Sequence, residues 1–296
     1  MSNSPVIGLY EKALPEDYDL VQKLITTKSL GFDFMELSID ESDERINRLL
    51  WSRRKRASFI TQIQESETPV PSICLSVHRR YPLGSHDPHI RSQALDLLNL
   101  AIDFAADIGI RTIQLAGYDV YYEQSDHQTV QWFYEGLKQG LRHAAAKQVM
   151  LSMEMMDTNF MNSVVKFLLL KKKLPSQWLG LYPDVGNLSA WNLDVLSELE
   201  LGLGYATCIH LKDTLAVGPD SPGTFKGVAF GNGCVDFISI FRKLTSMKYG
   251  GPFLIEMWSS SLDDPLKEVK QARLWMLEQM RSAGFISVEP GTAEQS

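Results

Sequence analysis

Eight short apolar runs, spaced along almost the whole chain, constrain its fold most strongly. The runs are rich in β-branched and other strand-forming residues, and the segments between them are long enough for a helix and two turns. Parallel strands are expected, because each return to the sheet then requires a crossover. The alternation predicts an α/β fold, and eight units predict a closed (β/α)8 TIM barrel. The runs lie at 5–11, 32–39, 70–77, 112–118, 149–156, 179–185, 207–213 and 252–258.

Helical spacing is clearest between the third and fourth runs. There, apolar residues recur at steps of three and four positions, which places one apolar stripe along a helix. Comparable amphipathic stretches lie near 15–29, 43–65, 128–147 and 263–282. We expect these helices to cover the outside of the sheet. The stripe between the third and fourth runs consists of Ile90, Ala94, Leu97, Leu98, Ala101, Ile102 and Ala105.

An open, doubly wound sheet is the main alternative, because it uses the same alternation and needs about six strands. However, no G-x-G-x-x-G pattern follows the first run, and no G-x-x-x-x-G-K-[ST] motif occurs, so nucleotide binding lacks its usual signals. No low-complexity linker divides the 296 residues. We therefore expect a single barrel domain over 1–286, followed by a flexible tail over 287–296.

The charge and the cysteine content indicate which binding partners and which cellular compartment are expected. The 29 Lys and Arg against 36 Asp and Glu give a net charge of −7, a poor match for nucleic acid or an anionic membrane. Three widely spaced cysteines, Cys74, Cys208 and Cys234, indicate neither a disulfide framework nor a zinc knuckle. With no targeting leader and no apolar run of about 18 residues, we expect a cytoplasmic protein without a membrane partner. A homo-oligomer is compatible with the sequence.

Four polar residues lie near the ends of four consecutive predicted strands. Glu154, Asp184, His210 and Glu256 follow one another at intervals of about one strand–helix unit. In a barrel, the carboxyl ends of the strands meet at one mouth, so these side chains should converge. Buried carboxylates cost several kcal/mol unless a cation or hydrogen bonds offset them. Three carboxylates and one imidazole suit one divalent ion, namely Mn²⁺, Zn²⁺, Co²⁺ or Mg²⁺.

Each of these residues also has an ordinary structural explanation. His210 alone is compatible with a hydrogen-bonded core histidine, and Asp184 with the cap of the following helix. Either glutamate could pair with a buried Lys or Arg. Their occurrence at matched positions on consecutive strands favours one shared site. Further carboxylates near strand ends, for which supporting hydrogen bonds or helix caps are the simpler roles, are Glu36, Asp157 and Asp213.

Segments along nearly the whole chain resemble the bacterial L-ribulose-5-phosphate 3-epimerases, also described as L-xylulose-5-phosphate 3-epimerases. This family belongs to the xylose isomerase-like barrels and serves L-ascorbate degradation and related pentose phosphate pathways. The segments that carry the resemblance are IGLYEKALP (7–15), LGFDFMELSIDE (30–41), CLSVHRRYPLGS (74–85), IRTIQLAGYDVYY (110–122), MEMMD (153–157), LYPDVGNLSAW (181–191), HLKDT (210–214), FGNGCVDF (230–237) and GPFLIEMW (251–258).

The resemblance implies an isomerase that inverts C3 of a ketopentose 5-phosphate. It implies that Glu154, Asp184, His210 and Glu256 bind the metal, and that Glu154 and Glu256 are also the catalytic acid/base pair. One glutamate would remove the C3 proton to give a cis-enediolate, and the other would return a proton to the opposite face. At the third residue after Asp184, related epimerases of free sugars carry His where this chain has Asn187.

A phosphorylated substrate also needs an anion site, which barrels often form at the loops after the seventh and eighth strands. Basic side chains lie there, and the loop 230–236 contains glycines that would let backbone N–H groups approach an anion. Basic residues after the third strand form a second cluster. The candidate substrate-binding residues are Lys212, Lys226, His78, Arg79, Asn187 and Trp258.

Other functions remain compatible with a metal-binding barrel. An aldose–ketose isomerase or an inosose dehydratase would share the metal–enediolate chemistry. An abasic-site endonuclease usually needs more histidine ligands and a basic groove, which six His and a net charge of −7 do not favour. A non-catalytic sugar-phosphate-binding barrel is the alternative from a different class.

Overall fold

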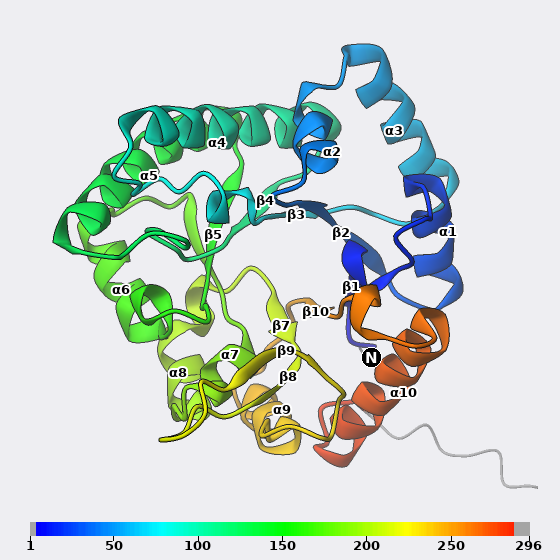
Figure 1. Ribbon diagram of the computed structural model, residues 1–296. Helices are drawn as coiled ribbons and strands as arrows, with labels where there is room; N and C mark the ends of the chain where they lie inside the picture. Colours follow the sequence, from blue (N-terminus) through cyan, green and yellow to red (C-terminus); the bar gives the residue numbers. More distant parts are fainter. Residues whose placement is uncertain (1–3, 287–296) are drawn as a thin grey trace, which may run out of the picture.

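Eight parallel strands form the centre of the molecule, and helices surround them (Figure 1). The computed structural model describes residues 4–286; the predicted tail, 287–296, lies outside the described residues. Each barrel strand falls within one of the eight predicted runs, which confirms the predicted TIM barrel. The barrel strands are β1 (Ile7–Tyr10), β2 (Phe34–Ile39), β3 (Ser72–Leu75), β4 (Thr112–Leu115), β5 (Met150–Glu154), β6 (Leu179–Tyr182), β7 (Ile209–Leu211) and β10 (Phe253–Ile255).

Strand order and closure distinguish this barrel from an open sheet. Neighbouring strands follow the order β6-β5-β4-β3-β2-β1-β10-β7, and every neighbouring pair is parallel. The two outer members of this order, β6 and β7, also meet. The Thr207 amide donates to the Leu181 carbonyl at 2.9 Å, and the His210 amide to the Pro183 carbonyl at 2.9 Å. The doubly wound alternative is therefore wrong.

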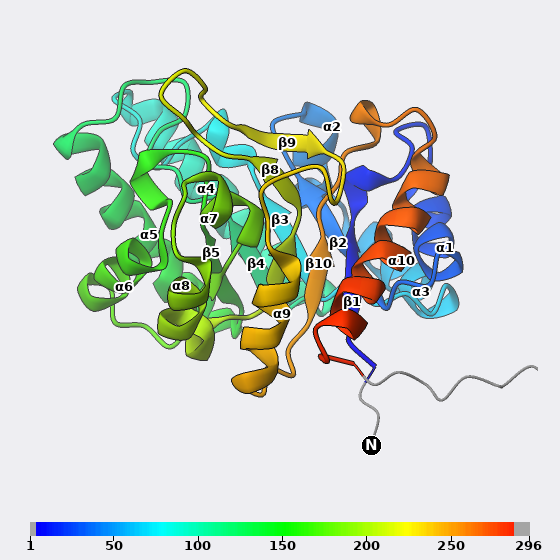
Figure 2. The same cartoon turned by 90° about the horizontal axis from the view of Figure 1, so that it is seen from below.

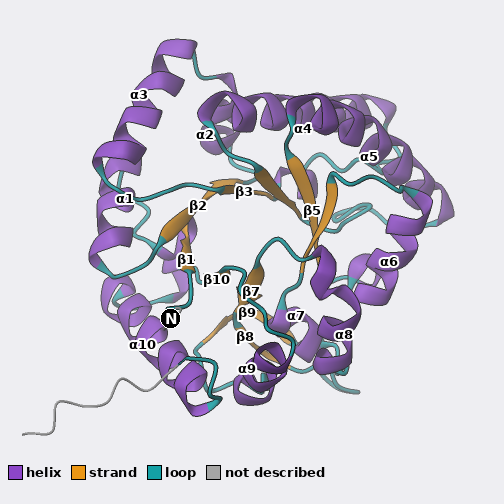
Figure 3. Ribbon diagram, turned by 180° about the vertical axis from the view of Figure 1, so that it is seen from behind, coloured by secondary structure: helices purple, strands orange, loops and turns teal. Residues whose placement is uncertain are grey.

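The helices lie outside the strands, as Figure 3 shows. Each of the α-helices begins after an Asp or Ser whose side chain accepts a backbone N–H of the first turn, which satisfies a donor that the helix cannot pair internally. The helices are α1 (Leu20–Ser29), α2 (Asp43–Ile46), α3 (Arg53–Glu65), α4 (Pro88–Ile108), α5 (His127–Lys147), α6 (Val164–Lys173), α7 (Val185–Ala190), α8 (Val195–Gly202), α9 (Phe237–Ser246) and α10 (Pro265–Ser282).

Alternation along the strands separates an outer core from the barrel interior. On β2, Met35, Leu37 and Ile39 belong to the large apolar core that the helices cover. The intervening Phe34 belongs to a second, smaller cluster inside the barrel, together with residues of other strands. Since successive side chains on a strand point to opposite faces, Glu36 also points into the barrel. The interior cluster consists of Tyr10, Phe34, Cys74, Tyr182, Cys208 and Leu254.

A short antiparallel hairpin interrupts the strand–helix alternation after β7. It consists of β8 (Asp213–Leu215) and β9 (Thr224–Val228), and it lies at the end of the barrel where β1 ends, away from the end where β1 begins (Figure 2). The sequence did not predict it, because β9 is short and largely exposed and its alternation of polar and apolar residues breaks at Gly227. The hairpin adds side chains to the mouth that the barrel strands do not supply.

Among residues 4–286, no helix combines the length and the apolar character needed to cross a membrane.

Gly117 allows the ends of β4 and β5 to lie close together. A Cβ atom at this position would lie 2.6 Å from the Glu154 carbonyl oxygen and 2.7 Å from Cβ of Met161. We predict that Gly117→Ala lowers the free energy of unfolding by about 1–3 kcal/mol, as expected for overpacking. Gly204→Ala is the control, since a Cβ there meets nothing within 4 Å, and its effect should stay within about 0.5 kcal/mol. Urea unfolding of both variants tests this, and equal stabilities would contradict it.

Candidate active site

Four side chains from consecutive barrel strands converge at the mouth. Glu154, Asp184, His210 and Glu256 each offer one ligand atom, and these four atoms all lie within 4.8 Å of one another. All four residues are buried. The structure therefore brings together the four residues that the sequence singled out.

The strand ends determine where these side chains lie. Glu154 is the last residue of β5, His210 is the middle residue of β7, and Glu256 follows β10 directly. Asp184 lies between β6 and α7, and its Oδ1 accepts the Asn187 amide at 2.9 Å as the cap of α7. This cap fixes the carboxylate orientation and leaves Oδ2 directed at the other three residues.

His210 is the centre of the cluster. Its Nδ1 lies 2.8 Å from Glu154 Oε1, 3.8 Å from Asp184 Oδ2 and 3.8 Å from Glu256 Oε2. Burial acts to lower the pKa of His210, but the negative charges of Glu256 and Glu154 outweigh it and raise the pKa well above its usual value. The carboxylates around His210 Nδ1 thus stabilise positive charge at that position.

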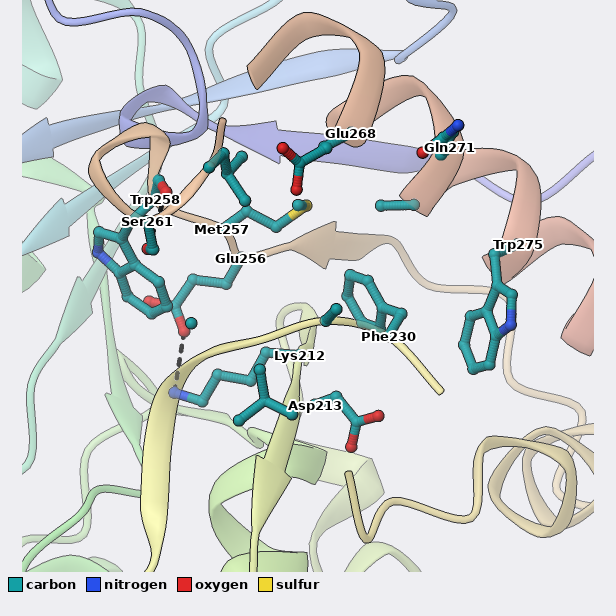
Figure 4. Close-up of a pocket in the computed structure, with 15 residues that line it drawn as sticks. Lys212, Asp213, Phe230, Glu256, Met257, Trp258, Ser261, Glu268, Gln271 and Trp275 are labelled. Atoms are coloured by element: carbon teal, nitrogen blue, oxygen red, sulfur yellow. Dashed lines mark hydrogen bonds and ion pairs between the residues drawn. The ribbon is translucent and has the colours of Figure 1, made fainter. Parts of the chain in front are cut away.

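Lys212 supplies one positive charge at the edge of the cluster. Its Nζ lies 2.7 Å from Asp184 Oδ2 and 3.0 Å from Glu256 Oε2, and Figure 4 shows its side chain extended towards the Glu256 carboxylate. Burial acts to raise the pKa of Asp184, but Lys212 and His210 outweigh burial and hold that pKa below its usual value.

Glu154 is the carboxyl group of the cluster whose pKa is raised. Burial raises its pKa to about 7, although His210 acts in the opposite direction. Gln114, on β4, donates a hydrogen bond to the other oxygen of this carboxyl.

The donor set fits a divalent metal ion. Three carboxylates and one imidazole are enclosed together beside the ammonium of Lys212, and enclosed carboxylates require compensating positive charge. Oxygen-rich sets with one nitrogen are typical of Mn²⁺, Mg²⁺, Co²⁺ or Zn²⁺ sites. The residues that could hold such an ion are Glu154, Asp184, His210 and Glu256.

A cavity opens directly above this cluster. It is lined by Glu154 and Glu256 from the cluster and by side chains of several loops at the mouth. Three basic residues besides Lys212 face it: Lys12 after β1, Arg79 after β3 and Lys226 on β9. The mouth therefore combines an acidic centre with a basic rim. The remaining residues around it include Tyr10, Ser76, Asp157, Asn187, Phe225 and Trp258.

Comparisons with known proteins agree with this architecture. A family model described as xylose isomerase-like TIM barrel matches residues 25–279. A protein of Escherichia coli (strain K12), provisionally named L-ribulose-5-phosphate 3-epimerase SgbU, is 51% identical over 95% of this chain and 98% of its own length. L-ribulose-5-phosphate 3-epimerase UlaE of Escherichia coli O139:H28 (strain E24377A / ETEC) is 48% identical over 97% of this chain and 99% of its own length. This chain belongs to the L-ribulose-5-phosphate 3-epimerase family of xylose isomerase-like barrels.

Solved structures show that the epimerase fold extends to distant relatives. A structure of an L-ribulose 3-epimerase has a TM-score of 0.74 at 20% identity and covers 94% of this chain and 95% of that one. A D-allulose 3-epimerase from Methylomonas sp., solved in complex with D-allulose, has a TM-score of 0.74 at 16% identity, and the match covers 93% of this chain and 97% of that one. At these identities the likeness concerns the fold alone.

Not all predicted substrate-binding residues face the mouth of this epimerase. Lys212, Lys226, Arg79, Asn187 and Trp258 line the cavity.

His78 is different. It is 3% exposed, its Nε2 lies 3.2 Å from the Ala94 carbonyl of α4, and it is not among the residues that line the cavity. The structure corrects the predicted position of His78. The short 3₁₀ helix Val77–Arg79 turns His78 inward and its neighbour Arg79 towards the mouth.

The predicted glycine-loop anion site is also wrong. The Gly231 and Gly233 amides each donate to Asp213 Oδ2 at 2.9 Å, so a carboxylate of the chain itself occupies these donors. A second cavity beside this loop, drawn in Figure 4, lies behind Glu256 and Lys212. It includes Asp213, Glu256 and Glu268, with Lys212 as the one cation among its lining residues, which disfavours an anion.

Sequence reasoning missed Lys12 and Gln114. Lys12 follows the end of β1, where a barrel presents functional side chains, and that position was the available signal. Gln114 lies inside an otherwise apolar strand, and its bond to Glu154 gave no sequence pattern of its own.

The burial of His78 should make the free energy of unfolding fall as the pH is lowered. Burial lowers the pKa of His78 to about 4, below the usual value of 6.5. The unfolded chain therefore binds a proton more tightly than the folded one between these values, and the histidine reduces stability as the pH falls from about 6.5 to about 4, by up to about 3 kcal/mol. We predict that His78→Gln loses less stability over this range than the parent protein. Urea unfolding at pH 7 and pH 4.5 measures the difference, and parallel pH dependences would contradict the prediction.

Proposed function

We propose that this chain is a metal-dependent 3-epimerase that interconverts L-ribulose 5-phosphate and L-xylulose 5-phosphate. The observation that carries the proposal is the convergence of Glu154, Asp184, His210 and Glu256 at the mouth of a chain about half identical, over nearly its full length, to proteins named L-ribulose-5-phosphate 3-epimerase. The proposed cofactor is one divalent ion, Mn²⁺, Zn²⁺, Co²⁺ or Mg²⁺. We place the reaction in the cytoplasm, in L-ascorbate or related pentose phosphate degradation.

The proposed reaction needs two acid/base groups at one carbon atom. Glu154 and Glu256 fill these roles: one takes the proton from C3, and the C–H electron pair moves into the enediolate. The other, in its acid form, returns a proton to the opposite face of C3, which inverts the centre. A divalent ion bound to the four residues would polarise the C2 carbonyl and offset the negative charge of the enediolate.

The surroundings of the two glutamates support these roles. Gln114 holds one Glu154 oxygen, which leaves the other directed at the cluster, and Lys212 orients Glu256. Asn187 donates to the Met155 carbonyl at 2.6 Å, and its own Oδ1 is buried without a hydrogen-bond partner. Because Asn187 lines the cavity, we propose that this oxygen accepts a hydrogen bond from a substrate hydroxyl.

The basic rim supports a phosphorylated substrate. Arg79 packs against the ring faces of Tyr118 and Tyr121, with its guanidinium carbon 5.5 and 5.4 Å from their centroids. Lys226 lies 5.4 Å from the Trp258 ring centroid and lines the same cavity as Arg79. We propose that these two cations bind the 5-phosphate, and that Trp258 packs against the sugar.

Solvent-proton exchange tests the two-base assignment. We predict that Glu154→Gln and Glu256→Gln each reduce interconversion of the two epimers by at least about 10²-fold, since an amide can neither accept nor return the proton. The variant that lacks the base facing the C3 proton of L-xylulose 5-phosphate also loses deuterium incorporation into that epimer in D₂O. The metal-loaded protein is incubated with substrate, and C3 deuterium and both epimers are followed by NMR. Near-normal turnover in either variant overturns the assignment. Hydrogen transfer at C1 instead of inversion at C3 would indicate an aldose–ketose isomerase.

The phosphate assignment predicts selective losses. Lys226→Met should raise KM for L-xylulose 5-phosphate by about tenfold, the loss expected for one charge-assisted hydrogen bond, and should leave kcat/KM for unphosphorylated L-xylulose nearly unchanged. Lys138→Met, at an exposed lysine on α5, is the matched control. Steady-state kinetics with both sugars measure the effect, and equal losses for both would contradict a phosphate contact.

A further inference from the structure

Glu36 is a fully buried carboxylate inside the barrel, below the metal-binding cluster. It lies on β2 and is 0% exposed. Its Oε2 accepts hydrogen bonds from Ser72 Oγ at 2.6 Å and from Tyr182 Oη at 2.9 Å. Its Oε1 is also buried but has no hydrogen-bond partner. A buried carboxylate oxygen without a partner is costly, so this atom calls for an explanation.

The explanation lies on the far side of the His210 ring. Nδ1 of His210 faces Glu154, Asp184 and Glu256. Nε2 points the other way, is buried and has no hydrogen-bond partner. It lies 3.6 Å from Glu36 Oε1. Among the described residues, His210 Nε2 and Glu36 Oε1 are thus each other's nearest ion-pair partner.

The 3.6 Å separation is too long for a hydrogen bond, but it determines where the ring proton is favourable. A lone pair on Nε2 would face the negative charge of Glu36 and be repelled. A proton on Nε2 would be attracted to the same charge. The carboxylate therefore favours the tautomer with hydrogen on Nε2 and a free lone pair on Nδ1.

Tyr182 holds both partners in this arrangement. Its hydroxyl anchors Glu36, and its ring packs edge-to-face against His210, with ring centroids 4.5 Å apart. Ser72 fixes the carboxylate from β3. Three strands thus restrict the freedom of Glu36, while the packing of Tyr182 restricts rotation of the imidazole.

We propose that Glu36 is a positioning residue that aims the Nδ1 lone pair of His210 at the bound metal ion. The inference rests on the metal site proposed above. Carboxylates that accept the second N–H of a metal-binding histidine fix its orientation, and their loss typically weakens metal binding 10- to 100-fold. At 3.6 Å Glu36 acts through its charge and not through a hydrogen bond, so we expect an effect at the lower end of this range. Glu36 does not touch the substrate or the ion in this role.

Direct metal binding tests the proposal. The metal-free full-length protein is titrated with Co²⁺ alone, and the visible absorption bands give both affinity and ligand geometry. We expect Glu36→Gln to weaken Co²⁺ binding by about tenfold and to alter the bands. Glu198→Gln is the matched control, because Glu198 is a buried carboxylate on the outer helix α8, where it accepts from the Val164 amide. It should bind Co²⁺ like the parent protein.

The outcomes separate this inference from the proposed function. If the parent protein binds no Co²⁺, the metal site itself is overturned. If the parent binds and Glu36→Gln binds with equal affinity and identical bands, the role of Glu36 is overturned while the metal site stands. Thermal melting of the metal-free proteins distinguishes loss of metal binding from loss of folding.

Two further measurements cover a Glu36→Gln protein that does not fold. Glu36→Asp keeps the negative charge, but its side chain is one methylene shorter and so holds the carboxylate farther from His210. Its Co²⁺ affinity should therefore lie below that of the parent protein. An affinity equal to that of the parent would overturn the proposal. Long-range ¹H–¹⁵N NMR of the Zn²⁺-loaded parent should show His210 protonated at Nε2. Protonation at Nδ1 would also overturn it.

Discussion

The concentration of negative charge at one end of the barrel is the constraint on which the rest of the site depends. Three carboxylates and an imidazole with ligand atoms within 4.8 Å of one another are stable only if the fold holds them there and positive charge compensates them. Barrel closure between β6 and β7 supplies part of that restraint, because the Pro183 carbonyl binds the amide of His210 itself. Strand register thus determines the geometry of the charge.

Several residues at this end combine a structural and a chemical role. Asp184 caps α7 with one oxygen and faces the cluster with the other. Asp213 holds the loop after β9 through its glycine amides, which removes that loop from anion binding. Carboxylates at strand ends therefore divide between those that face the cluster and those that support loops, and only their surroundings distinguish the two.

The fold and the central cluster could be predicted from the sequence, because the fold depends on the recurrence of apolar runs and the cluster on the position of polar residues at their ends. Eight apolar runs predict eight strands, and a polar residue at the end of each of four such runs predicts a shared mouth. The role of His78 could not be predicted in this way, since one 3₁₀ turn decides whether it or Arg79 faces the mouth. In the hairpin, the alternation of polar and apolar residues along β9 breaks at Gly227. The contact between Glu36 and His210 joins residues far apart in the sequence, and no local pattern records it.

The hairpin has a consequence for how such enzymes diversify. Lys226 and Phe225 reach the mouth from an antiparallel appendage and not from a barrel strand, whereas the acidic cluster is tied to the barrel by strand register and helix capping. Under the proposed function, changes in the length or composition of this appendage would alter which sugars are admitted without disturbing Glu154 and Glu256. Substrate choice and reaction chemistry can therefore evolve as separable modules within one barrel.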